Sequence, residues 1–131
     1  MRLRAAAVVI NELGQVLLVT PHNPDRADFP MALPGGGVEP NEHPSAAAIR
    51  ECVEETGIVA HLEISLGRLG STYYYMCTAR SRTPRPIDPE IAHANWVHPL
   101  TALSWLALSV PYGEESCETL RRALRAALHL K

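Results

Sequence analysis

Residues 36–58 of the chain read GGVEPNEHPSAAAIRECVEETGI, and this stretch decides how the rest of the sequence is interpreted. It combines a glycine-rich entry with glutamates and an arginine at fixed spacing. The positions that set this pattern are Gly36, Glu42, Arg50, Glu51, Glu54, Glu55 and Gly57. Carboxylates gathered this closely repel one another unless a cation lies among them. Because hard divalent cations prefer oxygen ligands, the segment indicates a metal site.

The run Pro44–Thr56 is predicted to be a helix. A proline opens it, where a missing N–H costs nothing, and Gly57 suits a left-handed stop after the last turn. At about 3.6 residues per turn, Glu51, Glu54 and Glu55 share one face of this helix. The spacing therefore places three carboxylates together.

The two sides of this helix are expected to have different roles. Ala47 falls on the carboxylate face one turn earlier, where a small side chain leaves room for a ligand. Glu42 lies upstream in the loop and is expected to fold back toward the carboxylates. The other side is expected to pack in the core through Ala46, Ile49, Cys52 and Val53.

Each part of the segment also has an ordinary interpretation. Neighbouring glutamates on a helix usually form a solvated face, and Arg50 beside Glu51 is compatible with a weak surface pair. The glycines at 35–37 are compatible with a plain turn. The joint match of all these identities at fixed spacing is what makes the signal specific.

This joint pattern resembles the Nudix box, G-x5-E-x7-R-E-U-x-E-E-x-G-U, in which U is a bulky apolar residue. Every fixed position is filled here, and Cys52 stands in a U position as a small hydrophobe. The resemblance implies an α+β fold, in which a mixed sheet lies between helices as an α/β/α sandwich. It also implies hydrolysis of a diphosphate linkage with Mg²⁺ or Mn²⁺.

The resemblance further implies roles for individual residues. Glu51, Glu54 and Glu55 are expected to hold the metal, together with the backbone carbonyl of Gly35. Glu51 and Glu54 are also the expected catalytic glutamates, and Arg50 is expected to orient Glu51 rather than touch substrate. The general base stays open between a glutamate of the box and a residue outside it.

Length and composition limit the classes of function. The 131 residues are expected to form one domain, 1–131, and the 47% hydrophobic and 20% charged content is typical of a soluble globular protein. A net charge of −2 argues against a nucleic-acid polymer as partner, because such a partner favours a basic face. Small-molecule nucleotides stay compatible, since metal ions can neutralise their phosphates.

Compartment and membrane association are predicted from the same composition. The cysteines lack zinc or disulfide spacing, which suits a reducing cytoplasm. The apolar run in MRLRAAAVVI is too short for a signal peptide and is interpreted as a strand. No segment is long enough to span a membrane. The oligomeric state stays open between a monomer and a homodimer.

Outside the box, periodicity predicts the remaining elements. Strands are expected at Ala5–Ile10, Val16–Thr20, His61–Leu69, Thr72–Ala79 and Ala94–His98. A short helix is expected within Pro99–Leu108, and Glu114–Leu130 is expected to be an amphipathic helix. Its apolar stripe consists of Leu120, Ala123, Leu124, Ala127 and Leu128.

The substrate-binding candidates come from the connecting loops and from one strand. Phe29 is a candidate for stacking on a base, Tyr74 for a contact from the tyrosine strand, and Glu90 for a late approach to the metal. At least one residue of the run 73–75 must pack inward, because side chains alternate along a strand. Further candidates, each also compatible with a solvated or core position, are His22, Asp25, Arg26, Asp28, His93, Trp96, His98, Glu114 and Glu115.

Three functions compete for this sequence. The first is a metal-dependent hydrolase of a nucleoside diphosphate derivative, such as a nucleoside triphosphate or a dinucleoside polyphosphate. The alternative is a non-catalytic nucleotide-binding module, which a replaced box carboxylate would favour, and none is replaced. An isomerase of a diphosphate ester would need additional catalytic groups, for which the sequence offers no firm match.

Overall fold

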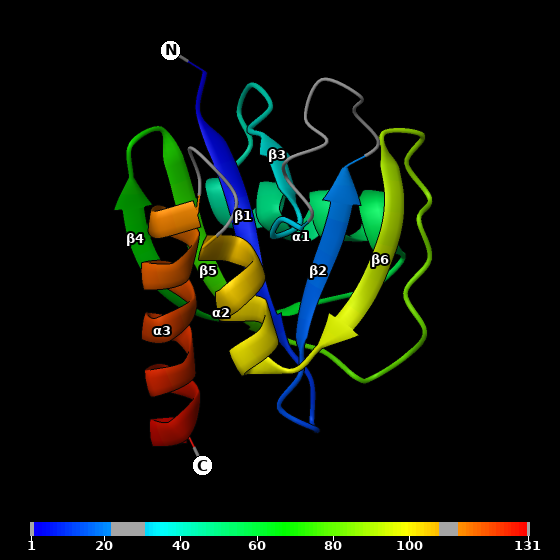
Figure 1. Ribbon diagram of the computed structural model, residues 1–131. Helices are drawn as coiled ribbons and strands as arrows, with labels where there is room; N and C mark the ends of the chain where they lie inside the picture. The colour runs from blue at the N-terminus through cyan, green and yellow to red at the C-terminus, as the bar shows by residue number, and fades with distance from the viewer. Residues whose placement is uncertain (1, 22–30, 108–112, 131) are drawn as a thin grey trace.

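A computed structural model describes residues 2–21, 31–107 and 113–130 of the chain. The described strands are β1 (Arg4–Ile10), β2 (Val16–Pro21), β3 (Gly35–Gly37), β4 (His61–Leu69), β5 (Thr72–Thr78) and β6 (Ile91–Val97). The described helices are α1 (Pro44–Thr56), α2 (Pro99–Ala107) and α3 (Gly113–Leu130). Helix α1 covers one face of the sheet and helices α2 and α3 cover the other (Figure 1). The predicted α/β/α sandwich is confirmed.

The sheet is mixed and has β1 at its centre. Its order is β4-β5-β1-β2-β6 within the described residues, and β1 runs parallel to β5 along its whole length. On its other side, β1 meets β2 only at Ile10–Val16 and meets β3 at its beginning, where Ala6 lies opposite Gly35. The glycine strand is thus inserted between β1 and β2, and the beginning of the box is held at the centre of the sheet.

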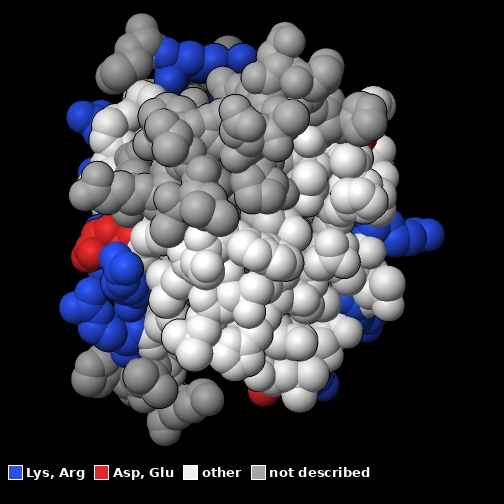
Figure 2. Space-filling view, in the orientation of Figure 1, with Lys and Arg blue, Asp and Glu red and all other residues white. Residues whose placement is uncertain are grey.

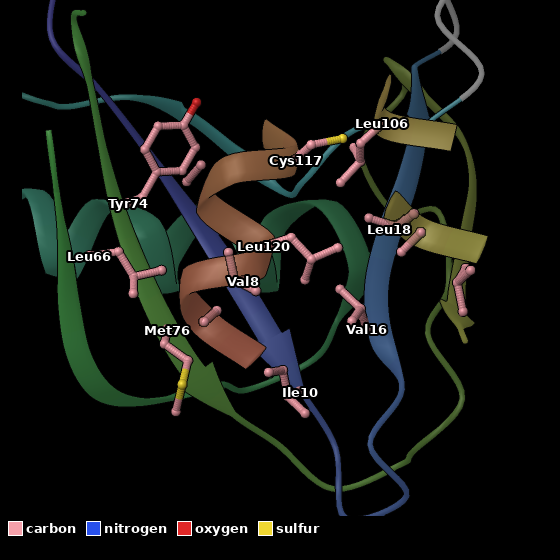
Figure 3. Packing of buried hydrophobic residues seen from close by; sticks show 14 residues of the cluster. Val8, Ile10, Val16, Leu18, Leu66, Tyr74, Met76, Leu106, Cys117 and Leu120 are labelled. Atoms are coloured by element: carbon pink, nitrogen blue, oxygen red, sulfur yellow. The ribbon is translucent and has the colours of Figure 1, made fainter. Parts of the chain in front are cut away.

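Both faces of β1 are buried, which explains its unbroken apolar sequence. Ala5, Ala7 and Val9 face the cluster under α1. Val8 and Ile10 face the opposite cluster, where the side chains of the sheet meet those of α2 and α3 (Figure 3). On this second face the Lys, Arg, Asp and Glu side chains of the described residues lie around the margin, and uncharged residues fill the lower part of the centre (Figure 2).

Helix α1 has the predicted bounds because both of its ends are capped. The Nδ1 atom of His43 accepts a hydrogen bond from Ser45 N at 3.1 Å. Gly57 adopts φ 74°, and its N–H donates to Val53 O at 2.9 Å. A residue with a Cβ is strained at this φ, so glycine ends the helix here.

The orientation of α1 differs from the expected one. Ala46 and Val53, expected in the core, are exposed, whereas Ala47, expected to leave room for a ligand, is buried. The buried face is Ala47, Ala48, Cys52, Glu55 and Thr56. The helix is rotated so that the carboxylate side approaches the glycine strand, because glycine leaves space there. One expected ligand, Glu55, is therefore on the anchored side.

Two other predictions need correction or extension. Strand β6 begins at Ile91 rather than Ala94, because it pairs with β2 from Pro21 to Val16. In α3, Leu120 and Ala123 are buried as expected, and the buried face also includes Cys117 and Thr119. Among the described residues, no helix is long and apolar enough to cross a membrane.

Leu120 tests the packing of α3 on the sheet. Its side chain is fully buried, whereas Leu100 on α2 is 70% exposed. Leu120→Ala should lower the free energy of unfolding by about 2–5 kcal/mol, and the control Leu100→Ala by less than about 0.5 kcal/mol, measured by urea denaturation. Equal losses in both variants would contradict this packing.

Candidate functional site

The site is built where α1 approaches the glycine strand. Gly35 N donates a hydrogen bond of 2.8 Å to Glu55 Oε1. A Cβ placed on Gly36 would lie 2.5 Å from Oε1 of Glu51. Two carboxylates of the helix therefore lie directly against the backbone of β3, and only glycine allows this close approach.

Arg50 organises the remaining acidic groups. Its Nε and Nη2 atoms donate to both oxygens of Glu42, at 2.8 and 3.0 Å. Nη2 also donates to Gly37 O at 3.0 Å, while Nη1 donates to Glu51 Oε1 at 3.0 Å and to Glu54 at 3.2 Å. Glu42 thus folds back as expected, but onto Arg50. The guanidinium joins the loop, the glycine strand and the helix.

The carboxylates have different electrostatic environments. Hydrogen bonds from Arg50 hold the pKa of Glu42 at about 2. Burial raises the pKa of Glu55 to about 8, and the charges of Glu51 and Asp88 add to this increase. Burial also raises the pKa of Glu51, although Arg50 opposes this increase. The site therefore holds two desolvated carboxylates whose negative charge is incompletely compensated.

This donor set fits a hard divalent cation. Glu51 and Glu55 offer carboxylate oxygens, and a cation between them would offset the desolvation and repulsion that raise their pKa values. Glu54 is turned outward onto Arg50 and its side chain is 49% exposed. Accordingly, no three acidic, histidine or cysteine side chains in the described ranges converge into a complete metal cage. The expected trio is thus split into the buried Glu55, the partly buried Glu51 and the exposed Glu54.

The substrate-binding candidates lie in different environments. Tyr74 is buried in the cluster under α2 and α3, with only 4% exposure, so it is part of the core. Glu90 is exposed in the turn before β6. Trp96 is partly buried under α1, and its Nε1 donates to Arg82 O at 2.8 Å. Candidates outside the described residues or side chains are His22, Asp25, Arg26, Asp28, Phe29, Glu114 and Glu115.

The two histidine candidates have no shared role. His93 is exposed on β6. His98 Nδ1 accepts a hydrogen bond of 3.2 Å from Leu100 N, which caps the beginning of α2. Neither arrangement brings an imidazole into the hydrogen bonds around Arg50.

Sequence reasoning missed Asp88, which the loop before β6 brings to α1. Ile87 N donates to Glu55 O at 3.1 Å, and Arg85 N donates to Thr56 O at 3.0 Å. These bonds satisfy carbonyls at the end of the helix and place Asp88 where its charge raises the pKa of Glu55. No local pattern signals this contact, since it depends on where a long loop returns.

Neighbouring glycines provide a test of the close approach. A Cβ on Gly35 would lie 2.5 Å from Ala5 O, whereas the three atoms nearest to a Cβ on Gly36 all belong to the flexible end of the Glu51 side chain. Gly35→Ala should cost about 1–3 kcal/mol of stability, because backbone must move. Gly36→Ala should cost less than about 1 kcal/mol but weaken Mn²⁺ binding at least about tenfold by displacing Glu51.

Urea denaturation and electron paramagnetic resonance of Mn²⁺ measure the two effects of the glycine variants separately. The Gly35→Ala variant serves as the comparison for stability and the wild type as the comparison for Mn²⁺ affinity. Unchanged Mn²⁺ affinity in Gly36→Ala would contradict the placement of Glu51.

The buried charge of Glu55 predicts a pH dependence of stability in metal-free protein. Because the pKa of Glu55 is about 8 when folded and about 4.3 when unfolded, the folded state binds the extra proton between these values. Stability of the wild type should therefore fall as pH rises from about 4.3 to about 8. Glu55→Gln keeps an acceptor for Gly35 N and removes this loss. If the free energies of unfolding of wild type and Glu55→Gln, measured in EDTA, changed with pH in the same way, the raised pKa of Glu55 would be contradicted.

Sequence comparison finds relatives that hydrolyse phosphorylated compounds, according to their names. The chain is 45% identical over 64 residues to a putative 8-oxo-dGTP diphosphatase of Bacillus subtilis, covering 48% of this chain and 40% of the relative. It is 42% identical over 72 residues to human diphosphoinositol polyphosphate phosphohydrolase 3-beta, covering 49% and 42%. The chain thus spans less than half the length of these curated relatives.

Comparison of whole folds and of family patterns extends the similarity along the chain. An Ap4A hydrolase of C. elegans matches with a TM-score of 0.71 and 22% identity, covering 98% of this chain and 99% of the other. That identity supports the fold alone. A family model described as the NUDIX domain matches residues 1–115. With the box residues placed on β3 and α1, this match shows that the chain belongs to the NUDIX domain family.

Proposed function

We propose that this protein is a divalent-cation-dependent hydrolase that cleaves a pyrophosphate linkage in a nucleoside diphosphate derivative. The observation that carries the proposal is that the buried Glu55 and the partly buried Glu51 lie against the glycine strand, with Glu54 beside them on Arg50. Relatives named as an 8-oxo-dGTP diphosphatase and a diphosphoinositol polyphosphate phosphohydrolase support the reaction class.

Glu51, Glu54 and Glu55, with the carbonyl of Gly35, are the proposed ligands of Mg²⁺ or Mn²⁺. When bound, such a cation neutralises phosphate oxygens and lowers the pKa of a coordinated water. Glu54 can contribute because its pair with Arg50 is half-exposed, and exposed ion pairs contribute little stability. The buried Glu55 is fixed by Gly35 N and supplies the rigid part of the site.

The proposed catalytic work of the protein falls to Glu51, Glu54 and Arg50. Burial raises the pKa of Glu51, which brings it closer to the range in which a carboxylate accepts a proton from water efficiently. Arg50 fixes the position of Glu51 through its 3.0 Å hydrogen bond. Glu54 is the second proposed base, because it is the most accessible carboxylate of the set.

The substrate is proposed to be a small nucleotide, either a nucleoside triphosphate, a dinucleoside polyphosphate or a similar diphosphate. A screen of these compounds with Mg²⁺, read by phosphate release and product mass, tests the reaction class. Magnesium-dependent release of phosphate, pyrophosphate or a nucleoside monophosphate is the expected result. Tight nucleotide binding without turnover would support the non-catalytic binding module instead.

Substitution of the proposed ligands tests their roles. Glu54→Gln and Glu55→Gln should each reduce kcat/KM by about 10²-fold or more, because each removes a charge that holds the cation or accepts a proton. Glu118→Gln is the matched control, since Glu118 is an exposed glutamate on α3. Full activity in both site variants would refute the proposed mechanism.

A further inference from the structure

A pocket of about 510 Å³ lies at the end of the sheet where the parallel strands β1 and β5 finish. This volume is typical of pockets that bind small organic molecules. The glycine strand meets β1 near its beginning, where Ala6 lies opposite Gly35, and α1 covers the other face of the sheet. The pocket is therefore separate from the proposed metal site.

The inner wall of this pocket is apolar. Ile10 and Met76 are buried in the cluster under α2 and α3, and Ala127 of α3 packs against the same cluster. Figure 3 shows Ile10 and Met76 at the lower end of the cluster. Ala79, which follows β5, adds a further small apolar side chain. The apolar part of a ligand would be removed from water here, which is favourable.

Three polar side chains of the pocket make their principal hydrogen bonds within the protein. The amide nitrogen of Asn11 donates to Gln15 Oε1 at 3.0 Å. The carboxylate of Glu12 accepts hydrogen bonds from Ser81 N, at 3.0 Å, and from the Ser81 hydroxyl. The Thr78 hydroxyl donates to a glutamate of β4 at 2.9 Å. These side chains are thus held in place and offer little to a ligand.

His61 and Arg80 are the polar lining residues with unused hydrogen-bonding capacity. Both side chains are exposed, and within residues 2–21, 31–107 and 113–130 no hydrogen bond or ion pair engages either of them. Both can donate N–H bonds, and Arg80 carries a permanent positive charge. The exposed side of the pocket therefore favours an anionic acceptor over a cation.

The carboxylate of Glu12 leaves the guanidinium of Arg80 available. Hydrogen bonds from Ser81 are the main cause that lowers the pKa of Glu12, and the charge of Arg80 contributes less. No ion pair joins Glu12 to Arg80 in the described part of the chain. A ligand can therefore bind Arg80 without first breaking a contact within the protein.

We propose that this pocket binds a small organic carboxylate, with its apolar body against Ile10, Met76 and Ala127 and its carboxylate at Arg80 and His61. Burial of the apolar body would supply most of the affinity. The planar guanidinium matches the two oxygens of a carboxylate and would select the anionic end. This binding site goes beyond the proposed hydrolase activity and does not depend on it.

The probe is 4-phenylbutyrate, which joins a phenyl ring to a carboxylate through a short chain. Its titration into ¹⁵N-labelled protein, followed by NMR, measures the affinity and locates the site. EDTA is present, so that the carboxylate cannot bind through a metal ion. A Kd of about 2 mM or lower is expected for a ligand of this size, with the largest shifts at Thr78, Ala79 and Arg80. No binding, or largest shifts at Glu51 and Glu55, would overturn the proposal.

Two related compounds separate the apolar and the charged contributions. The amide 4-phenylbutyramide keeps the ring and lacks the charge, whereas butyrate keeps the carboxylate and lacks the ring. Each should bind at least about fivefold more weakly than 4-phenylbutyrate. Equal binding of the amide would show an apolar pocket without preference for anions, and equal binding of butyrate would show a surface contact with an anion. Either result would overturn the proposal.

A double variant tests the two groups at the exposed side. His61→Gln/Arg80→Gln should weaken binding of 4-phenylbutyrate at least about fivefold and change binding of the amide by less than about twofold. His93→Gln/Arg82→Gln is the matched control, because both residues are exposed and neither is among the described residues of the pocket. It should change either affinity by less than about twofold. A similar loss in the control would show a general charge effect and overturn the proposal.

A substitution on α3 tests the apolar wall without changing any charge. Ala127→Leu places a larger side chain in the pocket and should weaken binding of both 4-phenylbutyrate and the amide at least about fivefold, because it occupies their space. Ala126→Leu adds the same group at a neighbouring position that is not among the described lining residues, and should have less than about a twofold effect. Thermal unfolding verifies that all variants fold. Unchanged binding in Ala127→Leu, or an equal loss in Ala126→Leu, would overturn the proposal.

Discussion

The site depends on one close approach, that of helix α1 to the backbone of the glycine strand. Gly35 N holds Glu55 Oε1 at 2.8 Å, and Glu51 occupies the space that a Cβ on Gly36 would fill. This approach buries Glu55 and partly buries Glu51, and the desolvation raises the pKa values of both, although the hydrogen bond from Gly35 N opposes the increase at Glu55. A divalent cation between the two carboxylates would offset this desolvation. The contact of α1 with the glycine strand therefore orients the helix and also favours the binding of a metal ion.

The side chain of Arg50 connects the acidic residues of α1 to the loop and the strand that surround them. Its bonds to Glu42 and Gly37 O connect the loop before α1 with the glycine strand, and its bonds to Glu51 and Glu54 fix the outer side of the helix. One guanidinium thus limits repulsion among three carboxylates without entering the contact between Glu55 and β3. The guanidinium of Arg50 therefore supports both the loop before α1 and the proposed metal site.

Local signals predicted the parts of the fold that depend on local chemistry. Pro44 and Gly57 define the bounds of α1, and the spacing of the box predicted that Glu51 and Glu55 share one side of the helix, but not that Glu54 turns outward onto Arg50. The rotation of α1, which buries Ala47 and exposes Val53, depends on where β3 enters the sheet. The position of Asp88 depends likewise on a returning loop. Side-chain periodicity carries no information about such nonlocal contacts.

Whether α1 and the glycine strand together bind a divalent cation is tested most directly by locating manganese in crystals of the protein soaked with Mn²⁺, using anomalous scattering. We expect a manganese peak coordinated by the carboxylates of Glu51 and Glu55 beside the glycine strand, with Glu54 redirected toward it. A peak elsewhere, or none at these carboxylates under saturating Mn²⁺, would contradict a cation site at Glu51 and Glu55.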